Sequence, residues 1–156
     1  MKLLFICTHN RCRSILSEAI TNHLAGTRIR AFSAGSQPAG AVHPQTLQHL
    51  QARAIPTDGL ASKSWDTLQE VNPDAVITVC DSAAGETCPL WLGQSVRVHW
   101  GLPDPSKLEG AEAEAAFAAV MDTIAARTRA LLAANVDQLR GAELQQALDK
   151  IAGEVQ

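Results

Sequence analysis

The chain has 156 residues, of which 46% are hydrophobic and 19% charged, and its formal net charge is −3. This length suits one globular domain, and the composition argues against intrinsic disorder. The negative charge does not favour nucleic-acid binding, and no apolar run approaches the ~20 residues of a membrane span. The N-terminal apolar run is too short for a signal peptide, so we expect a cytoplasmic protein with no membrane association.

The predicted elements alternate between strands and helices along the chain. Short apolar runs predict strands near residues 3–6, 28–32, 75–79 and 96–100. Apolar positions at helical spacing predict helices over 13–26, 44–54, 64–71 and 109–132. This alternation favours an α/β fold, a three-layer sandwich with a four-stranded parallel sheet and right-handed crossovers. We expect residues 1–134 to form the domain, and residues 135–156 to add a C-terminal helix packed on it.

The most informative stretch is the loop between the first strand and the first helix, from Cys7 to Ser14. A loop this tight turns backbone N–H groups inward, and with a helix N-terminus behind it forms a site for a tetrahedral oxyanion. Arg13 adds a planar fork of donors suited to two oxygens of that anion. The predicted anion-binding residues are Thr8, His9, Asn10, Arg11, Cys12, Arg13 and Ser14.

Cys7 is the candidate nucleophile. A helix N-terminus and a neighbouring cation lower the pKa of a thiol from its ordinary value of about 8.5, and the Ser14 hydroxyl could add a hydrogen bond. We therefore expect Cys7 to be a thiolate at neutral pH, placed beneath the bound anion. The alternative is a small buried hydrophobic residue at a strand end.

Two further candidates, Cys80 and Asp104, follow the ends of other predicted strands. Ligands of parallel sheets bind at the carboxyl ends of the strands, so both should lie near Cys7. Asp104 acts either as a general acid or as a turn residue that caps its loop.

Cys88 follows Cys80 after seven intervening residues, a longer spacing than that of a zinc pair. No second Cys/His pair stands at metal-ligand spacing, so we expect no metal. Serial thiol–disulfide exchange that involves Cys7 is the favoured interpretation, and two unrelated half-buried cysteines are the alternative.

The motifs together resemble those of a known family. Cys-X5-Arg-Ser directly after the first strand, with Ser33-Ala34-Gly35 and Asp104-Pro105, resembles the low-molecular-weight protein tyrosine phosphatase fold. Within that fold the closer resemblance is to thiol-dependent arsenate reductases, on the segments Ser62-Lys63, Val76–Asp81, Cys88-Pro89 and His99-Trp100. The phosphatase branch carries two tyrosines after its acid. This chain has no tyrosine, and an aryl phosphate would lack that stacking surface.

The resemblance implies reduction of arsenate to arsenite, with phosphate or sulfate as analogues of the substrate. Cys7 would attack arsenic while Asp104 gives a proton to the departing oxygen. Cys80 would then attack the sulfur of Cys7, and Cys88 would take over the disulfide from Cys80. No bound cofactor is implied. The reductant would be thioredoxin, or glutathione with glutaredoxin, as a transient partner.

Three positions bear on how far the resemblance extends. The Cys80–Cys88 spacing is one residue longer than the pattern associated with thioredoxin coupling, and Arg11 replaces a small residue. Some relatives hold a monovalent cation near residues matching Asn10, Glu18 and Ser33, where Lys63 is expected to place its ammonium group instead. The competing functions are a phosphatase acting on phosphate monoesters and a non-catalytic oxyanion or redox sensor.

Overall fold

The computed structural model describes residues 1–85 and 95–155, and its centre is a parallel sheet. The strands are β1 (Lys2–Ile6), β2 (Arg30–Ala34), β3 (Ala75–Thr78) and β4 (Val96–His99). Their order across the four-stranded sheet is β2-β1-β3-β4, and each neighbouring pair is parallel. The central strands β1 and β3 are almost wholly buried, as their continuous apolar sequences require.

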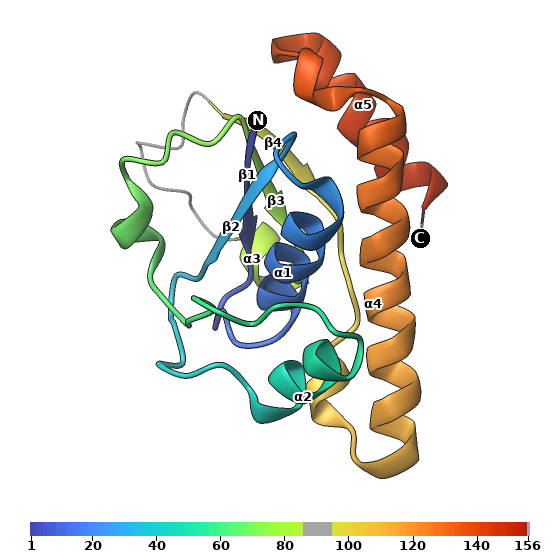
Figure 1. Ribbon diagram of the computed structural model, residues 1–156. Helices are drawn as coiled ribbons and strands as arrows, with labels where there is room; N and C mark the ends of the chain where they lie inside the picture. Colours follow the sequence, from blue (N-terminus) through green and yellow to red (C-terminus); the bar gives the residue numbers. More distant parts are fainter. Residues whose placement is uncertain (86–94, 156) are drawn as a thin grey trace.

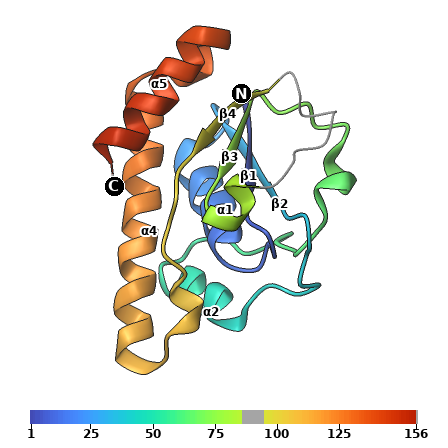
Figure 2. The ribbon, with the colours of Figure 1, turned by 180° about the vertical axis from the view of Figure 1, so that it is seen from behind.

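Five helices accompany the sheet within the described residues: α1 (Arg13–Ala25), α2 (Pro44–Ala52), α3 (Asp81–Ala84), α4 (Gly110–Ala133) and α5 (Gly141–Glu154). Helices α1 and α4 pack against each other beside the sheet. Figure 2 shows α4 and α5 on one side of the sheet and the green segment around residues 60–71 on the other. The three-layer α/β architecture predicted from the sequence is therefore confirmed. None of the described helices has the length and apolar character needed to span a membrane.

The C-terminal helix α5 crosses from α4 to the outer strand β4 (Figure 1). Its apolar side chains Leu144, Leu148 and Ile151 are buried. The Trp100 indole donates a hydrogen bond to the Leu148 carbonyl at 3.2 Å, and the Gln145 amide donates to the Arg97 carbonyl at 2.8 Å. Helix α5 thus packs on the body that contains the sheet.

Two sequence predictions of local structure were wrong. The second strand lies two residues later than predicted, because Ser33 and Ala34, which follow the predicted end of the strand, pair with Phe5 and Ile6 of β1. The helix predicted over 64–71 is only the 3-10 turn η1 (Trp65–Leu68), and no residue of it is buried. Without a buried apolar stripe, a longer helix there would gain little from packing.

Candidate active site

The loop from Cys7 to Ser14 is held by its carbonyl groups. The carbonyls of Thr8, His9 and Arg11 each accept a hydrogen bond at 2.9 Å from a backbone N–H group of the 37–43 segment. Among the described residues, the N–H groups of His9, Arg11 and Cys12 have no acceptor. Such amides, in front of the N-terminus of α1, suit a bound oxyanion.

The buried side chain of Asn10 links the loop to helix α1 and to the backbone of Lys63. It adopts a left-handed conformation with φ of 46°, which Asn tolerates better than most residues. Its fully buried side chain donates to the Ser14 hydroxyl at 2.8 Å and accepts from the Lys63 amide at 2.9 Å. The side chains of Asn10 and Ser14, both predicted to bind the anion, therefore bond to each other, and we interpret Asn10 as a support of the loop.

Gly35 leaves the loop the room it needs. A Cβ atom at this position would lie 2.6 Å from the Cys7 carbonyl oxygen and closer still to that of Thr8. Both are backbone atoms, so any side chain here would displace the loop itself. The Ser33-Ala34-Gly35 motif therefore needs glycine at its last position, because the loop backbone leaves no room for a Cβ atom.

A lysine ammonium group lies beneath the loop. Lys63 Nζ donates to the carbonyls of Ser33 at 3.0 Å and Ala61 at 2.8 Å, and lies 3.7 Å from the Glu18 carboxylate. The Ser33 hydroxyl donates to the same carboxylate oxygen at 2.5 Å. Burial raises the pKa of Glu18 and lowers that of Lys63, and their mutual attraction opposes both shifts. The ammonium group therefore lies where the resemblance placed it, beside Glu18 and Ser33.

Cys7 and Cys80 meet at the ends of the adjacent strands β1 and β3. Both are buried free thiols, and Cys80 Sγ accepts a hydrogen bond from the Thr8 amide at 3.4 Å. The neighbouring Cys7 thiol, acting as a donor toward Cys80, lowers the pKa of Cys80 to about 5, against the effect of burial and with help from the Thr8 and Ala83 amides. The same interaction, followed by burial, raises the pKa of Cys7.

The expected charge on Cys7 is therefore corrected. The raised pKa of Cys7 and the lowered pKa of Cys80 favour the negative charge on Cys80 rather than on Cys7. Arg13 does lower the pKa of Cys7, as predicted, but the neighbouring Cys80 and burial outweigh it. The sequence placed Cys80 near Cys7 but gave no sign that the two thiols shift each other's pKa in opposite directions.

Asp104 caps a turn, which is one of its two predicted roles, and its carboxylate also lies beside Arg13 at the anion loop. One carboxylate oxygen accepts from the Ser106 amide at 3.0 Å and hydroxyl at 2.6 Å, which caps the short turn η3 (Pro105–Lys107). The other lies 3.7 Å from the Arg13 guanidinium. Burial alone would raise the pKa of Asp104, but Ser106 and Arg13 outweigh it and hold the pKa below its ordinary value. The carboxyl group is therefore ionised near neutral pH.

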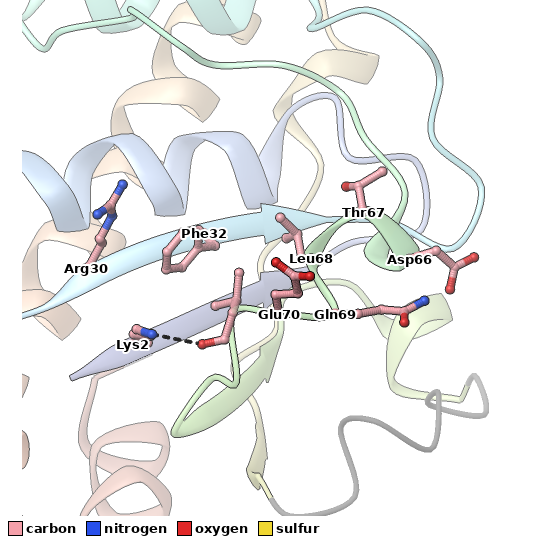
Figure 3. Close-up of a pocket in the computed structure, with 9 residues that line it drawn as sticks. Lys2, Arg30, Phe32, Asp66, Thr67, Leu68, Gln69 and Glu70 are labelled. Atoms are coloured by element: carbon pink, nitrogen blue, oxygen red, sulfur yellow. Dashed lines mark hydrogen bonds between the residues drawn. The ribbon is translucent and has the colours of Figure 1, made fainter.

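These groups enclose a small cavity of about 20 Å³, lined by Cys7, His9, Arg11, Cys12, Arg13 and Asp104. A space this small suits an inorganic anion better than an aromatic ring. A much larger cavity, of about 650 Å³, lies against β1 and β2 and the 66–71 segment (Figure 3). There Lys2 Nζ donates to the Val71 carbonyl at 3.1 Å, and none of the predicted site residues lines the cavity.

The other predicted residues take different places. Cys12 is buried in the loop, where burial raises the pKa of its thiol to about 11. Cys88 lies outside the described residues. Among residues 1–85 and 95–155, no cluster of three or more His, Cys, Asp or Glu side chains could hold a metal ion.

Sequence reasoning missed His99, which was taken for an ordinary strand residue. Its ring bonds Thr78 Oγ1 through Nδ1 at 2.7 Å and Asp81 Oδ1 through Nε2 at 3.0 Å. This contact ties the first residue of α3, directly after Cys80, to β4. The position of His99 at the carboxyl end of a strand was the available signal.

Comparison with known proteins shows the family of this chain. Residues 2–146 match the family described as low molecular weight phosphotyrosine protein phosphatase. The arsenate reductase of Halalkalibacterium halodurans is 34% identical over 127 residues, which cover 80% of this chain and 90% of that protein.

Solved structures of arsenate reductases are similar to this chain in fold. One described as an arsenate reductase in the phosphate binding state has a TM-score of 0.71 at 26% identity and covers 85% of this chain and 97% of its own. The thioredoxin-dependent arsenate reductase of Corynebacterium glutamicum has a TM-score of 0.64 at 29% identity, over 86% of this chain and 61% of its own. The chain therefore belongs to the low molecular weight phosphotyrosine protein phosphatase family and, within it, to the thiol-dependent arsenate reductases.

Proposed function

We propose that this protein reduces arsenate to arsenite, with Cys7 as the nucleophile and Cys80 as the thiol that resolves the intermediate. The observation that carries the proposal is that a second free thiol, Cys80, lies against the anion loop, bonded to the Thr8 amide and close enough to Cys7 for each thiol to shift the pKa of the other. Phosphate-ester hydrolysis needs one nucleophilic thiol, whereas a two-electron reduction needs a second thiol within reach. The arsenate reductases among the relatives support the same assignment.

Arsenate would bind through the loop amides and Arg13. The Arg13 guanidinium lies beside the cavity, where Nη1 donates to the Leu102 carbonyl at 3.1 Å. Its remaining donors suit two oxygens of a tetrahedral anion. The loop amides without acceptors would stabilise the charge that develops on the other oxygens.

The first chemical step forms a sulfur–arsenic bond. Cys7 passes its proton to the neighbouring Cys80 thiolate and attacks arsenic as a thiolate itself. One arsenic–oxygen bond breaks, and the departing oxygen leaves as water after taking up a proton. Asp104 is the group placed to deliver that proton. Because Asp104 is ionised in this structure, it first takes the proton from a protonated arsenate.

The second step is the reduction. Cys80 gives the proton that it received from Cys7 to water and, as a thiolate, attacks the sulfur of Cys7, so a disulfide bond forms and the sulfur–arsenic bond breaks. The electron pair of the broken bond stays on arsenic, which passes from arsenic(V) to arsenic(III) and leaves as arsenite after protonation by water. The two thiols are oxidised as arsenate is reduced, which balances the electrons.

A thiol reductant must then restore the enzyme. We propose that Cys88 attacks Cys80 and carries the disulfide outward to a cytoplasmic reductant. Thioredoxin is supported by the name of the Corynebacterium glutamicum relative, and glutathione with glutaredoxin is the alternative. No resident cofactor takes part in this scheme.

The test is a steady-state assay of arsenite release, run separately with thioredoxin and its reductase and with glutathione and glutaredoxin. Reduction in at least one system is expected, and Cys80→Ser should abolish turnover in both. Hydrolysis of p-nitrophenyl phosphate and phosphate binding serve as controls, because both use the loop without Cys80. Full arsenite release by Cys80→Ser, or phosphatase activity without any reduction, would overturn the proposal.

A further inference from the structure

Arg127 of α4 is a buried cation that the reaction scheme does not use. It is 6% exposed, and no carboxylate lies within ion-pair distance of it in the described part of the chain. Burial lowers the pKa of its guanidinium group. Removing such a charge from water costs on the order of several kcal/mol, so the guanidinium group needs hydrogen-bond partners that offset this cost.

Those partners are three backbone carbonyls and one aromatic ring. The guanidinium donates to the carbonyls of Trp100 at 3.0 Å, Gly101 at 3.4 Å and Val155 at 3.1 Å. It also stacks over the Trp100 ring, 5.6 Å from the centroid. Arg127 therefore joins the segment that follows β4 to the end of the C-terminal helix α5.

The segment held by Arg127 leads directly to the anion site. The next residue, Leu102, donates from its amide to the Val79 carbonyl at 3.0 Å and accepts from Arg13 Nη1 at 3.1 Å. Two residues later the chain reaches Asp104. A shift of the Trp100–Gly101 carbonyls would thus move the acceptor that orients Arg13.

Helix α5 completes the connection from the other side. The Val155 carbonyl directly follows this helix, and the Trp100 indole donates to the Leu148 carbonyl within it. We propose that Arg127 is a positioning residue through which α5 holds the 100–104 segment and, by way of the Leu102 carbonyl, orients Arg13 in the anion site. This inference rests on the anion site assigned under the proposed function.

The test measures binding of inorganic phosphate by calorimetry, together with kcat and KM for arsenate. Arg127→Met keeps packing volume against Trp100 but leaves the three carbonyls without their donor. Arg127→Lys keeps the charge but cannot reach all three carbonyls. Both should weaken phosphate binding by about tenfold and raise KM more than they lower kcat. Arg129→Met, an exposed arginine on the same helix, is the matched control and should leave phosphate binding unchanged.

Two further variants separate positioning from folding. In an Arg13→Lys background, Arg127→Met should change phosphate affinity by less than about twofold, because the orienting hydrogen bond is already altered. A chain ending at Glu154 lacks the Val155 carbonyl and should bind phosphate about threefold more weakly. A lower Tm with unchanged phosphate affinity in the Arg127 variants would show a merely structural residue and overturn the inference.

The phosphate measurement keeps this inference distinct from the proposed function. If the wild-type protein fails to reduce arsenate while Arg127→Met still weakens phosphate binding, the proposed function is wrong and the positioning role stands. If arsenate is reduced and the Arg127 variants match the wild type in both assays, the positioning role is wrong and the proposed function stands.

Discussion

The anion loop and the turn of residues 80–84 meet where Thr8 donates to Cys80 Sγ, but they are held in different ways. The carbonyls of the loop are bonded to the 37–43 segment, Asn10 is fully buried, and Gly35 packs directly against the backbone. Cys80 instead opens α3, a single turn of four residues without a side-chain cap. The His99–Asp81 contact that ties this turn to β4 lies at the surface, with the Asp81 side chain 99% exposed.

This difference matches the two chemical tasks. Binding and attack require donors that are already in place when the anion arrives, so a rigid loop is an advantage. Disulfide exchange requires sulfur atoms to approach successive partners, which a weakly anchored turn permits more readily. A surface contact such as that of His99 with Asp81 contributes only about 0–1 kcal/mol. We infer that the loop provides affinity and that the turn of residues 80–84 is the less firmly held part of the site.

The largest expected effect comes from Gly35→Ala. The new methyl group would overlap the Cys7 and Thr8 carbonyls, so the loop must shift and its amides lose their alignment. Arsenate reduction and phosphate binding should both fall by about 100-fold or more, with a loss of roughly 1–3 kcal/mol in stability. Gly40→Ala, where a Cβ meets no atom within 4 Å, is a control for the change in side chain, although its φ of 90° adds strain. Normal phosphate affinity in Gly35→Ala would show that the loop is not rigid.

The second prediction concerns the pKa of Cys80, the thiol on the turn of residues 80–84. Its lowered pKa keeps the thiolate present above about pH 5, so alkylation of Cys80 by iodoacetamide should decline only as the pH falls through that value. In Cys7→Ala the main cause of the lowered pKa is removed, and the midpoint should move to higher pH. Residue-resolved mass spectrometry across a pH series measures both curves. Coincident curves would mean that the two thiols do not share a proton.

The smallest expected effect concerns Lys63. Lys63→Met removes the ammonium group from Ser33 and Ala61 and leaves the mostly buried Glu18 without its cation, at a cost of about 2 kcal/mol in stability. Catalysis should fall only a few-fold, because the loop is held at other points. Potassium chloride should raise the Tm of this variant above that in sodium chloride, and should not do so for the wild type. Stimulation of the wild type by potassium would contradict the role given to Lys63.

Local sequence patterns sufficed for the sheet, the long helices and the meeting of Cys7 with Cys80. Strand ends in a parallel sheet fall on one edge, so the order of elements alone brings these residues together. The remaining features depend on contacts between residues that are far apart in the sequence. The extension of β2 through Ser33 and Ala34 depends on pairing with β1, and the roles of His99 and Arg127 depend on partners 18 or more residues away. The lowered pKa of Cys80 depends on its neighbours Cys7 and Thr8, which no local sequence pattern places beside it.

The central claim is tested most directly by a single-turnover experiment. Fully reduced Cys88→Ser protein is mixed with one equivalent of arsenate without any external reductant, then quenched and mapped by mass spectrometry while arsenite is measured. We predict one equivalent of arsenite and a disulfide between Cys7 and Cys80. Arsenite release with both of these thiols still reduced, or with a disulfide that excludes Cys80, would contradict the account.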